Sequence, residues 1–156
     1  MILPDPVPEE AQDNAVSVLI VGDHDAVREA LRDWIAASCT DVKIHEALDG
    51  EDALRLAERT AVDIVLMDIG LPGISGIEAT RVLRERSPEI GVVVISVNDG
   101  EVQHAAATTA GAVAFIAKRR MHEELTSVLK PLLEDRLRRA RAAGGHAPTP
   151  PARGNS

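Results

Sequence analysis

The chain has 156 residues, of which 45% are hydrophobic and 27% charged, a composition typical of a globular domain with its own core. Tyr is absent, and Trp34 and Phe115 are the only Trp and Phe, which argues against a stacking surface for single-stranded nucleic acid. The net charge is −8, a single cysteine excludes an internal disulfide, and no apolar run approaches the roughly 18 residues of a membrane span. We therefore expect a cytoplasmic protein without a membrane partner.

Basic residues gather at the C-terminal end of the chain. Residues 118–156 contain 9 Lys/Arg and 4 Asp/Glu, whereas residues 1–117 contain 8 and 21. A basic run can bind nucleic acid, but no recognition motif accompanies this one. We interpret it as the solvated face of a terminal helix and expect no direct nucleic-acid binding.

Residues 1–14 are rich in proline and acidic side chains, which predicts a disordered N-terminal tail. Beyond them, apolar runs typical of buried strands alternate with stretches of helical periodicity. The predicted strands cover residues 16–21, 42–46, 63–68, 91–96 and 112–117. The predicted helices cover residues 25–38, 50–59, 77–86 and 100–110, and a longer one begins near Met121. Asp25 is expected to cap the first of these helices.

This alternation predicts an α/β fold with right-handed crossovers and a parallel sheet covered on both faces. The near-continuous apolar strands fit burial on both faces. The count of five strands favours the flavodoxin-like doubly wound (βα)5 fold with strand order 2-1-3-4-5. Strands 1 and 3 are then neighbours, and a binding crevice lies between their carboxyl ends.

The last helix extends beyond this core. Its leucines form one apolar stripe, which we interpret as packing within the molecule, although a dimer seam is an alternative. Pro131 predicts a kink, or a break at which it opens a second short helix. We expect Gly144 and Gly145 to end this helix. The expected organisation is a domain over residues 15–130, a helical extension over 131–143 and a disordered tail over 144–156.

Four polar residues end or follow predicted strands: Asp23, Asp68, Ser96 and Lys118. The carboxyl ends of parallel strands meet at one edge of the sheet, where such folds bind ligands. Two carboxylates, a hydroxyl and an ammonium group at one edge indicate a phosphoryl-transfer site that holds Mg²⁺. Asp68 could be the nucleophile, since carboxylates form aspartyl-phosphate intermediates. Taken singly, each of the four could instead be a helix cap, turn former or solvated strand end.

The segments that carry these residues resemble the receiver domain of bacterial two-component response regulators. The resemblance covers about residues 16–130 and rests on Val18–His24, Leu66–Gly76, Val94–Ser96 and Gly111–Lys118. It is strongest toward the helix-turn-helix (NarL/FixJ-like) subfamily. We expect a stand-alone receiver without the DNA-binding domain of that subfamily, because only 12 residues follow Gly144.

The resemblance implies a role for each matching residue. Asp68 would accept a phosphoryl group from a histidine kinase or phosphotransfer protein. Asp23, Asp68 and the backbone carbonyl of Gly70 would hold Mg²⁺, Ser96 and Phe115 would form the switch, and Lys118 would pair with the phosphoryl group. The output surface would be the helix over 100–110, the strand over 112–117 and the following helix, through which a downstream protein partner or a second copy would bind.

The sequence also departs from the family pattern. Gly22 replaces one of two acidic residues, so we expect weak Mg²⁺ binding, and Val97 is bulky where many receivers have a small residue. These departures leave open a degenerate receiver that binds proteins without phosphorylation. An aspartyl-nucleophile phosphatase of the haloacid-dehalogenase type is disfavoured, because Gly70 stands where that family needs a second Asp. We expect a signalling protein and not an enzyme. The five histidines show no metal-ligand spacing.

Overall fold

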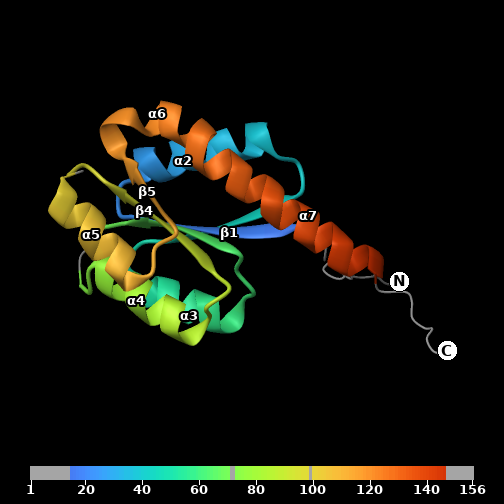
Figure 1. The fold of residues 1–156 in the computed structure, drawn as a ribbon, viewed down its shortest axis with the longest axis horizontal. Helices are drawn as coiled ribbons and strands as arrows, with labels where there is room; N and C mark the ends of the chain where they lie inside the picture. The colour runs from blue at the N-terminus through green and yellow to red at the C-terminus, as the bar shows by residue number, and fades with distance from the viewer. Residues whose placement is uncertain (1–14, 71–72, 99, 147–156) are drawn as a thin grey trace, which may run out of the picture.

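The structure is a computed structural model that describes residues 15–70, 73–98 and 100–146. The predicted tail over residues 1–14 lies outside these residues, as do residues 147–156 of the predicted C-terminal tail. Its strands form one five-stranded sheet in the order β2-β1-β3-β4-β5, with every neighbouring pair parallel (Figure 1). The predicted fold class and strand order are therefore confirmed. The strands are β1 (Val16–Val21), β2 (Val42–Ala47), β3 (Ile64–Asp68), β4 (Gly91–Ser96) and β5 (Ala114–Ala117).

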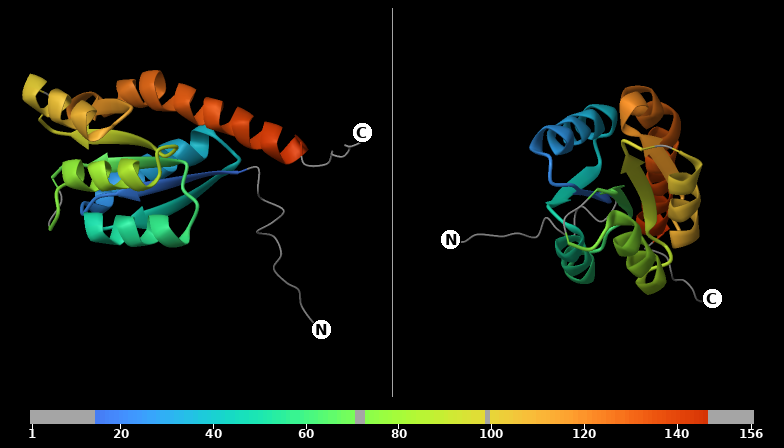
Figure 2. Two further views of the ribbon diagram at one scale, coloured as in Figure 1. Left: turned by 60° about the horizontal axis from the view of Figure 1, so that its bottom comes forward. Right: turned by 90° about the vertical axis from the view of Figure 1, so that its left-hand side faces the viewer.

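The sheet is covered on both faces, as its apolar strands require. Even-numbered β1 residues such as Val18 and Ile20 pack with α2 (Asp25–Ser38) and the C-terminal helices. Odd-numbered Leu19 and Val21 pack with α3 (Gly50–Arg59), α4 (Gly76–Arg86) and α5 (Glu101–Ala110). The two apolar layers lie on opposite sides of the sheet, and the ribbon views agree with this division (Figures 1 and 2). Every residue of β3 and β4 is buried.

Local capping explains where α3 and α4 begin and where α5 ends. Asp49 accepts a hydrogen bond from the Asp52 amide and starts α3, and Ser75 accepts one from the Glu78 amide and starts α4. The prediction for the first helix was wrong, because the N-cap is His24 without a side-chain bond and Asp25 lies inside the first turn. Gly111 ends α5 with a φ of 107°, a left-handed conformation that favours glycine.

The C-terminal segment is a run of four helical pieces. It comprises a 3₁₀ turn η1 (Lys118–Arg120), α6 (Met121–Glu124), a π-helical stretch η2 (Leu125–Leu129) and α7 (Lys130–His146). The irregularity predicted at Pro131 is this π-helical stretch, and the helix that follows is long instead of short. Figure 2 shows α7 running along the sheet and past its end. The helix includes Gly144 and Gly145, so the prediction that they end it was wrong.

The C-terminal helices are built into the core. Leu125, Leu129, Leu133 and Leu137 are buried among residues of β1, β3 and β4. Arg136 also donates a hydrogen bond of 2.8 Å to the carbonyl of Glu89, just before β4. The leucine stripe therefore packs within the molecule, as we interpreted it. None of the helices in the described part of the chain combines the length and the apolar character that crossing a membrane requires.

Candidate functional site

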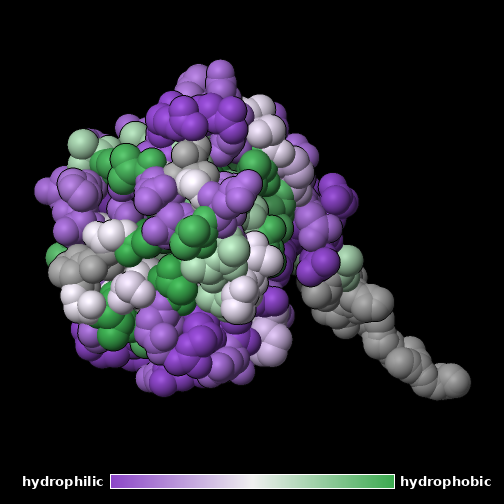
Figure 3. Space-filling model, turned by 60° about the vertical axis from the view of Figure 1, so that its left-hand side comes forward, coloured by the Kyte–Doolittle hydropathy of each residue, from purple (hydrophilic) through white to green (hydrophobic). Residues whose placement is uncertain are grey.

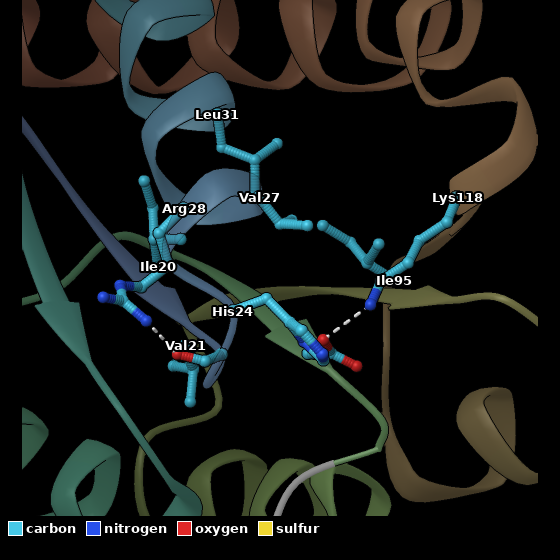
Figure 4. A pocket seen from close by; sticks show the side chains of 10 residues that line it. Ile20, Val21, His24, Val27, Arg28, Leu31, Ile95 and Lys118 are labelled. Atoms are coloured by element: carbon cyan, nitrogen blue, oxygen red, sulfur yellow. Dashed lines mark hydrogen bonds and ion pairs between the residues drawn. The ribbon is translucent and has the colours of Figure 1, made fainter.

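Asp68 is the last residue of β3 and is almost completely buried, with 7% of its surface exposed. A carboxylate in such a place needs compensating partners. Lys118 Nζ lies 2.8 Å from Asp68 Oδ2, and the Gly70 amide donates a hydrogen bond of 2.9 Å to Oδ1. The dashed line near Lys118 in Figure 4 marks the ion pair. Two oxygens on one buried carboxylate are thus held by an ammonium group and a backbone N–H.

The chain turns sharply behind Asp68, and Gly76 makes that turn possible. A Cβ atom at Gly76 would lie 2.3 Å from the Asp68 carbonyl oxygen. The Gly76 amide also donates a hydrogen bond of 3.2 Å to the Ile69 carbonyl. The start of α4 is therefore seated directly on the backbone that carries the carboxylate. The sequence placed Gly76 just before the helix predicted over residues 77–86 and gave no sign of this close approach.

Asp23 and Asp68 come together as the sequence predicted, and His24 joins them. One ligand atom from each of Asp23, His24 and Asp68 lies within 4.8 Å of the others. His24 Nδ1 is 3.1 Å from Asp23 Oδ1, and both side chains are partly open to solvent. Two carboxylates at this spacing fit a divalent cation that keeps several waters. The carbonyl of Gly70 as a further ligand stays a prediction, because the contact given for Gly70 is its amide on Asp68.

Gly22 and Arg28 lie close to Asp23 and line the pocket beside Asp68. A Cβ atom at Gly22 would lie 3.6 Å from Asp68 Cβ, so an acidic side chain at this position would reach the same cluster. In this chain the cluster lacks that carboxylate. Arg28 Nη1 donates a hydrogen bond of 2.6 Å to the Gly22 carbonyl, and its Nε donates one of 3.0 Å to Glu46. The bond with Glu46 contributes most to raising the Arg28 pKa, so the guanidinium stays charged.

The sequence did not predict a place in the site for Arg28 or for His24. Arg28 lies three residues after Asp25, with which it forms an ion pair, and this helical spacing was the available signal. No spacing signal marked His24, because its approach depends on the conformation of the loop after β1. Both residues line a pocket together with Asp68 and Lys118 (Figure 4). The rest of this pocket is formed by residues of β1, α2 and β4 and by Gly22. These remaining lining residues are Ile20, Val21, Gly22, Val27, Leu31 and Ile95.

Ser96 and Phe115 lie in the strands beside this pocket. Ser96 ends β4, is buried, and its Oγ accepts a hydrogen bond of 3.0 Å from the Asn98 amide. Phe115 of β5 is partly buried and stacks on His104 of α5, with ring centroids 3.9 Å apart and an angle of 26°. Val97 is 71% exposed. The structure thus places Ser96 at the predicted edge of the sheet and Phe115 against the neighbouring helix.

This fold and this acidic cluster are those of a flavodoxin-like α/β domain with a candidate cation site at the carboxyl edge of its sheet, and comparison with known proteins gives the family. Residues 18–130 match the family described as the response regulator receiver domain. The chain belongs to this family. Phosphorylation and Mg²⁺ binding at an acidic pocket are typical of its members, which are signalling modules and not classical enzymes.

The similar proteins are regulators of the NarL/FixJ group. Response regulator GacA from Pseudomonas aeruginosa is 36% identical over 74% of this chain and 54% of its own length. Response regulator UvrY from Escherichia coli is 34% identical over 74% of this chain and 53% of its own length. Transcriptional regulatory protein DegU from Brevibacillus brevis is 31% identical over 78% and 52%. The chain spans about half the length of the curated relatives it matches.

Solved structures give the same result. The crystal structure of a LuxR-family two-component response regulator from Aurantimonas sp. SI85-9A1 has a TM-score of 0.71 and 30% identity. The match covers 84% of this chain and 98% of that one. A CheY-like receiver domain protein from Methanospirillum hungatei JF-1, with a TM-score of 0.70 and 22% identity, supports the fold alone.

Proposed function

We propose that this chain accepts a phosphoryl group on Asp68 from a histidine kinase or phosphotransfer protein, and that it signals through protein–protein contacts. The observation that carries the proposal is the ion pair between Asp68 and Lys118 beside a second carboxylate, that of Asp23. A carboxylate at the end of a buried strand can attack phosphorus as an oxygen nucleophile: the O–P bond of an acyl phosphate forms while the P–N bond to the donor's histidine breaks and the imidazole leaves. Lys118 then offsets the charge of the phosphoryl oxygens.

The reaction needs a divalent cation, for which Asp23, Asp68 and the Gly70 carbonyl are the proposed ligands. When bound, the cation neutralises charge on the phosphoryl oxygens. The missing carboxylate at Gly22 supports weak Mg²⁺ binding, since each lost oxygen group lowers the attraction for a hard cation. We propose Ser96 and Phe115 as the switch: Ser96 approaches the phosphoryl group and Phe115 leaves the His104 ring for the space that opens.

The proposed output surface comprises α5, β5 and α6. Val102 at the start of α5 and Val113 before β5 are 80% and 50% exposed, which supports a protein-binding role for this side. Figure 3 shows apolar residues at several places on the face that includes α5. The partner is a downstream protein or a second copy of the chain, and we propose a cytoplasmic location without nucleic-acid or membrane contacts.

A degenerate receiver that binds its partner without phosphorylation is the second candidate, and Gly22 is the observation that favours it. The two functions differ in whether Asp68 is modified. A phosphate-affinity gel after incubation with a small phosphodonor and a divalent cation separates them. The proposal predicts a retarded band for the wild type and none for Asp68→Asn, whereas Asp33→Asn on the exposed side of α2 keeps the shift.

Two outcomes would contradict phosphoryl acceptance at Asp68. The first is the absence of a shifted band in the wild type at millimolar Mg²⁺ and also with a transition-metal cation. The second is a band of equal strength in the wild type and in Asp68→Asn. The first result would leave the degenerate receiver as the better description, and the second would place the phosphoryl group on a residue other than Asp68.

A further inference from the structure

His24 adds a nitrogen ligand to a cluster that otherwise offers oxygen. Its imidazole, one carboxylate oxygen of Asp23 and one of Asp68 lie within 4.8 Å of one another. Figure 4 shows the imidazole beside the ion pair that Lys118 makes. The imidazole Nδ1 lies 3.1 Å from Asp23 Oδ1. The donor set is therefore two carboxylates and one imidazole.

The negative charge of this cluster is also partly neutralised by nearby cationic side chains. Lys118 already engages Asp68 Oδ2 at 2.8 Å. Position 22, from which a side chain would reach Asp68, is glycine. The Arg28 guanidinium lines the same pocket and contacts the Gly22 carbonyl. These features weaken the purely electrostatic attraction on which a hard cation such as Mg²⁺ depends.

We propose that His24 makes this site select a borderline divalent transition cation, such as Co²⁺ or Zn²⁺, over Mg²⁺. Imidazole is a good ligand for these ions, whereas Mg²⁺ takes oxygen donors and water. The absence of a carboxylate at position 22 lowers the affinity for Mg²⁺ more than the affinity for a borderline cation, because the borderline cation also binds the imidazole nitrogen of His24. The inference deepens the proposed function by naming the cation at its site. The inference rests on the proposed function only for the role of the cation in phosphoryl transfer. Cation binding itself is measured on the unphosphorylated chain, so it can be tested separately.

The test is titration calorimetry of the unphosphorylated full chain with Co²⁺ and, separately, with Mg²⁺. The wild type is expected to bind Co²⁺ more tightly than Mg²⁺. His24→Gln, which replaces the ring nitrogen by an amide oxygen, is expected to lose at least about tenfold in Co²⁺ affinity and to keep its Mg²⁺ affinity. His122→Gln on α6 is the matched control, with the same change on an exposed residue outside the cluster. Circular dichroism confirms that both variants fold.

A second readout locates the ligand. Addition of Zn²⁺ is expected to shift the imidazole ring signals of His24 in nitrogen-edited NMR spectra more than those of the other histidines. Equal Co²⁺ affinity in the wild type and in His24→Gln would overturn the inference, as would a shift confined to another histidine. Failure of phosphotransfer with intact His24-dependent Co²⁺ binding would refute the proposed function alone.

Discussion

Asp68 and Lys118 show at the scale of single residues how the site is held together. Their side chains are 9% and 18% exposed, so water screens the pair only in part. Lys118→Met removes the ammonium group, so the buried Asp68 Oδ2 loses this charged hydrogen-bond donor. We expect the free energy of unfolding to fall by about 1.5–3 kcal/mol, the usual range for a hydrogen bond to a charged group. Urea denaturation measures this change.

The control for Lys118→Met is Arg81→Met on α4. Arg81 also forms ion pairs, but both it and its partners Glu78 and Glu85 are about half exposed. An exposed pair contributes little, so the unfolding curve of this variant should nearly overlay that of the wild type. An equal loss in both variants would show that the Asp68–Lys118 pair has no special energetic role.

The sequence predicted the residues at strand ends better than those in loops. Asp68, Ser96 and Lys118 could be placed because parallel strands bring their carboxyl ends to one edge. His24 could not, because its position depends on the backbone of the loop after β1, and Arg28 on α2 could not, because its contact with the site depends on the same loop. Arg28 reaches the Gly22 carbonyl only in the folded loop. The roles of Ser96 and Phe115 as a switch stay predictions.

At the scale of elements, the join between β3 and α4 depends on Gly76. A methyl group there would lie 2.3 Å from the Asp68 carbonyl oxygen, which is backbone and cannot rotate away. Gly76→Ala is expected to lower the free energy of unfolding by about 3 kcal/mol through forced backbone shifts. Gly70→Ala is the control, because among the described residues the nearest atom to its Cβ would be Asp68 Oδ1, 3.8 Å away. Thermal unfolding that is equally affected in both variants would contradict this account.

The packing of α2 against β2 includes a charge cluster that gives a pH-dependent prediction. Partial burial alone would raise the pKa of Glu46, but hydrogen bonds from Arg32 and Arg28 outweigh it, so the pKa lies below its ordinary 4.5. The ionised carboxylate therefore stabilises the fold above the pKa of the unfolded chain. This contribution is lost as the pH falls through the lowered pKa.

Glu46→Gln tests this linkage. The wild type should exceed the variant in melting temperature at neutral pH, and the difference should shrink as the pH falls below about 4.5. Melting curves between neutral and acidic pH measure the difference. A constant difference across this range would show that the ionisation of Glu46 does not contribute to stability.

Element boundaries followed from local signals where those signals were strong. Asp49 and Ser75 cap helices as their residue types favour. Asp25 did not, because the side chain pairs with Arg28 from within the first turn of α2. The π-helical stretch before Pro131 was predicted as a kink or break and not by its type, since the missing N–H of proline permits several adjustments.

For the molecule as a whole, the C-terminal helix is part of the core. Leu133 of α7 is fully buried against residues from the sheet. Leu133→Ala is expected to cost about 2–5 kcal/mol in the free energy of unfolding, as large-to-small changes in a core do. Arg141→Ala, which removes only an exposed 3.0 Å contact with Asp41, should cost less than about 1 kcal/mol. Urea titration of both variants tests whether the helix is integral to the domain.

The architecture could be predicted as a whole because strands and helices alternate regularly along the chain. Each strand–helix–strand unit then forms a right-handed crossover between parallel strands. The two covered faces followed from the apolar strands, whereas the strand order followed from the count of five strands, which favours the doubly wound order 2-1-3-4-5. The expectation that no effector domain accompanies the receiver stays a prediction, because nothing in the fold of this chain tests it.

The central claim is that Asp68 is the residue that receives phosphate. Intact-mass spectrometry after exposure to a small phosphodonor and a divalent cation, followed by peptide mapping, measures this most directly. The account predicts the mass of one added phosphoryl group, located on the peptide that contains Asp68 and absent from Asp68→Asn. An unchanged mass under all cation conditions, or a phosphoryl group mapped to a different residue, would contradict it.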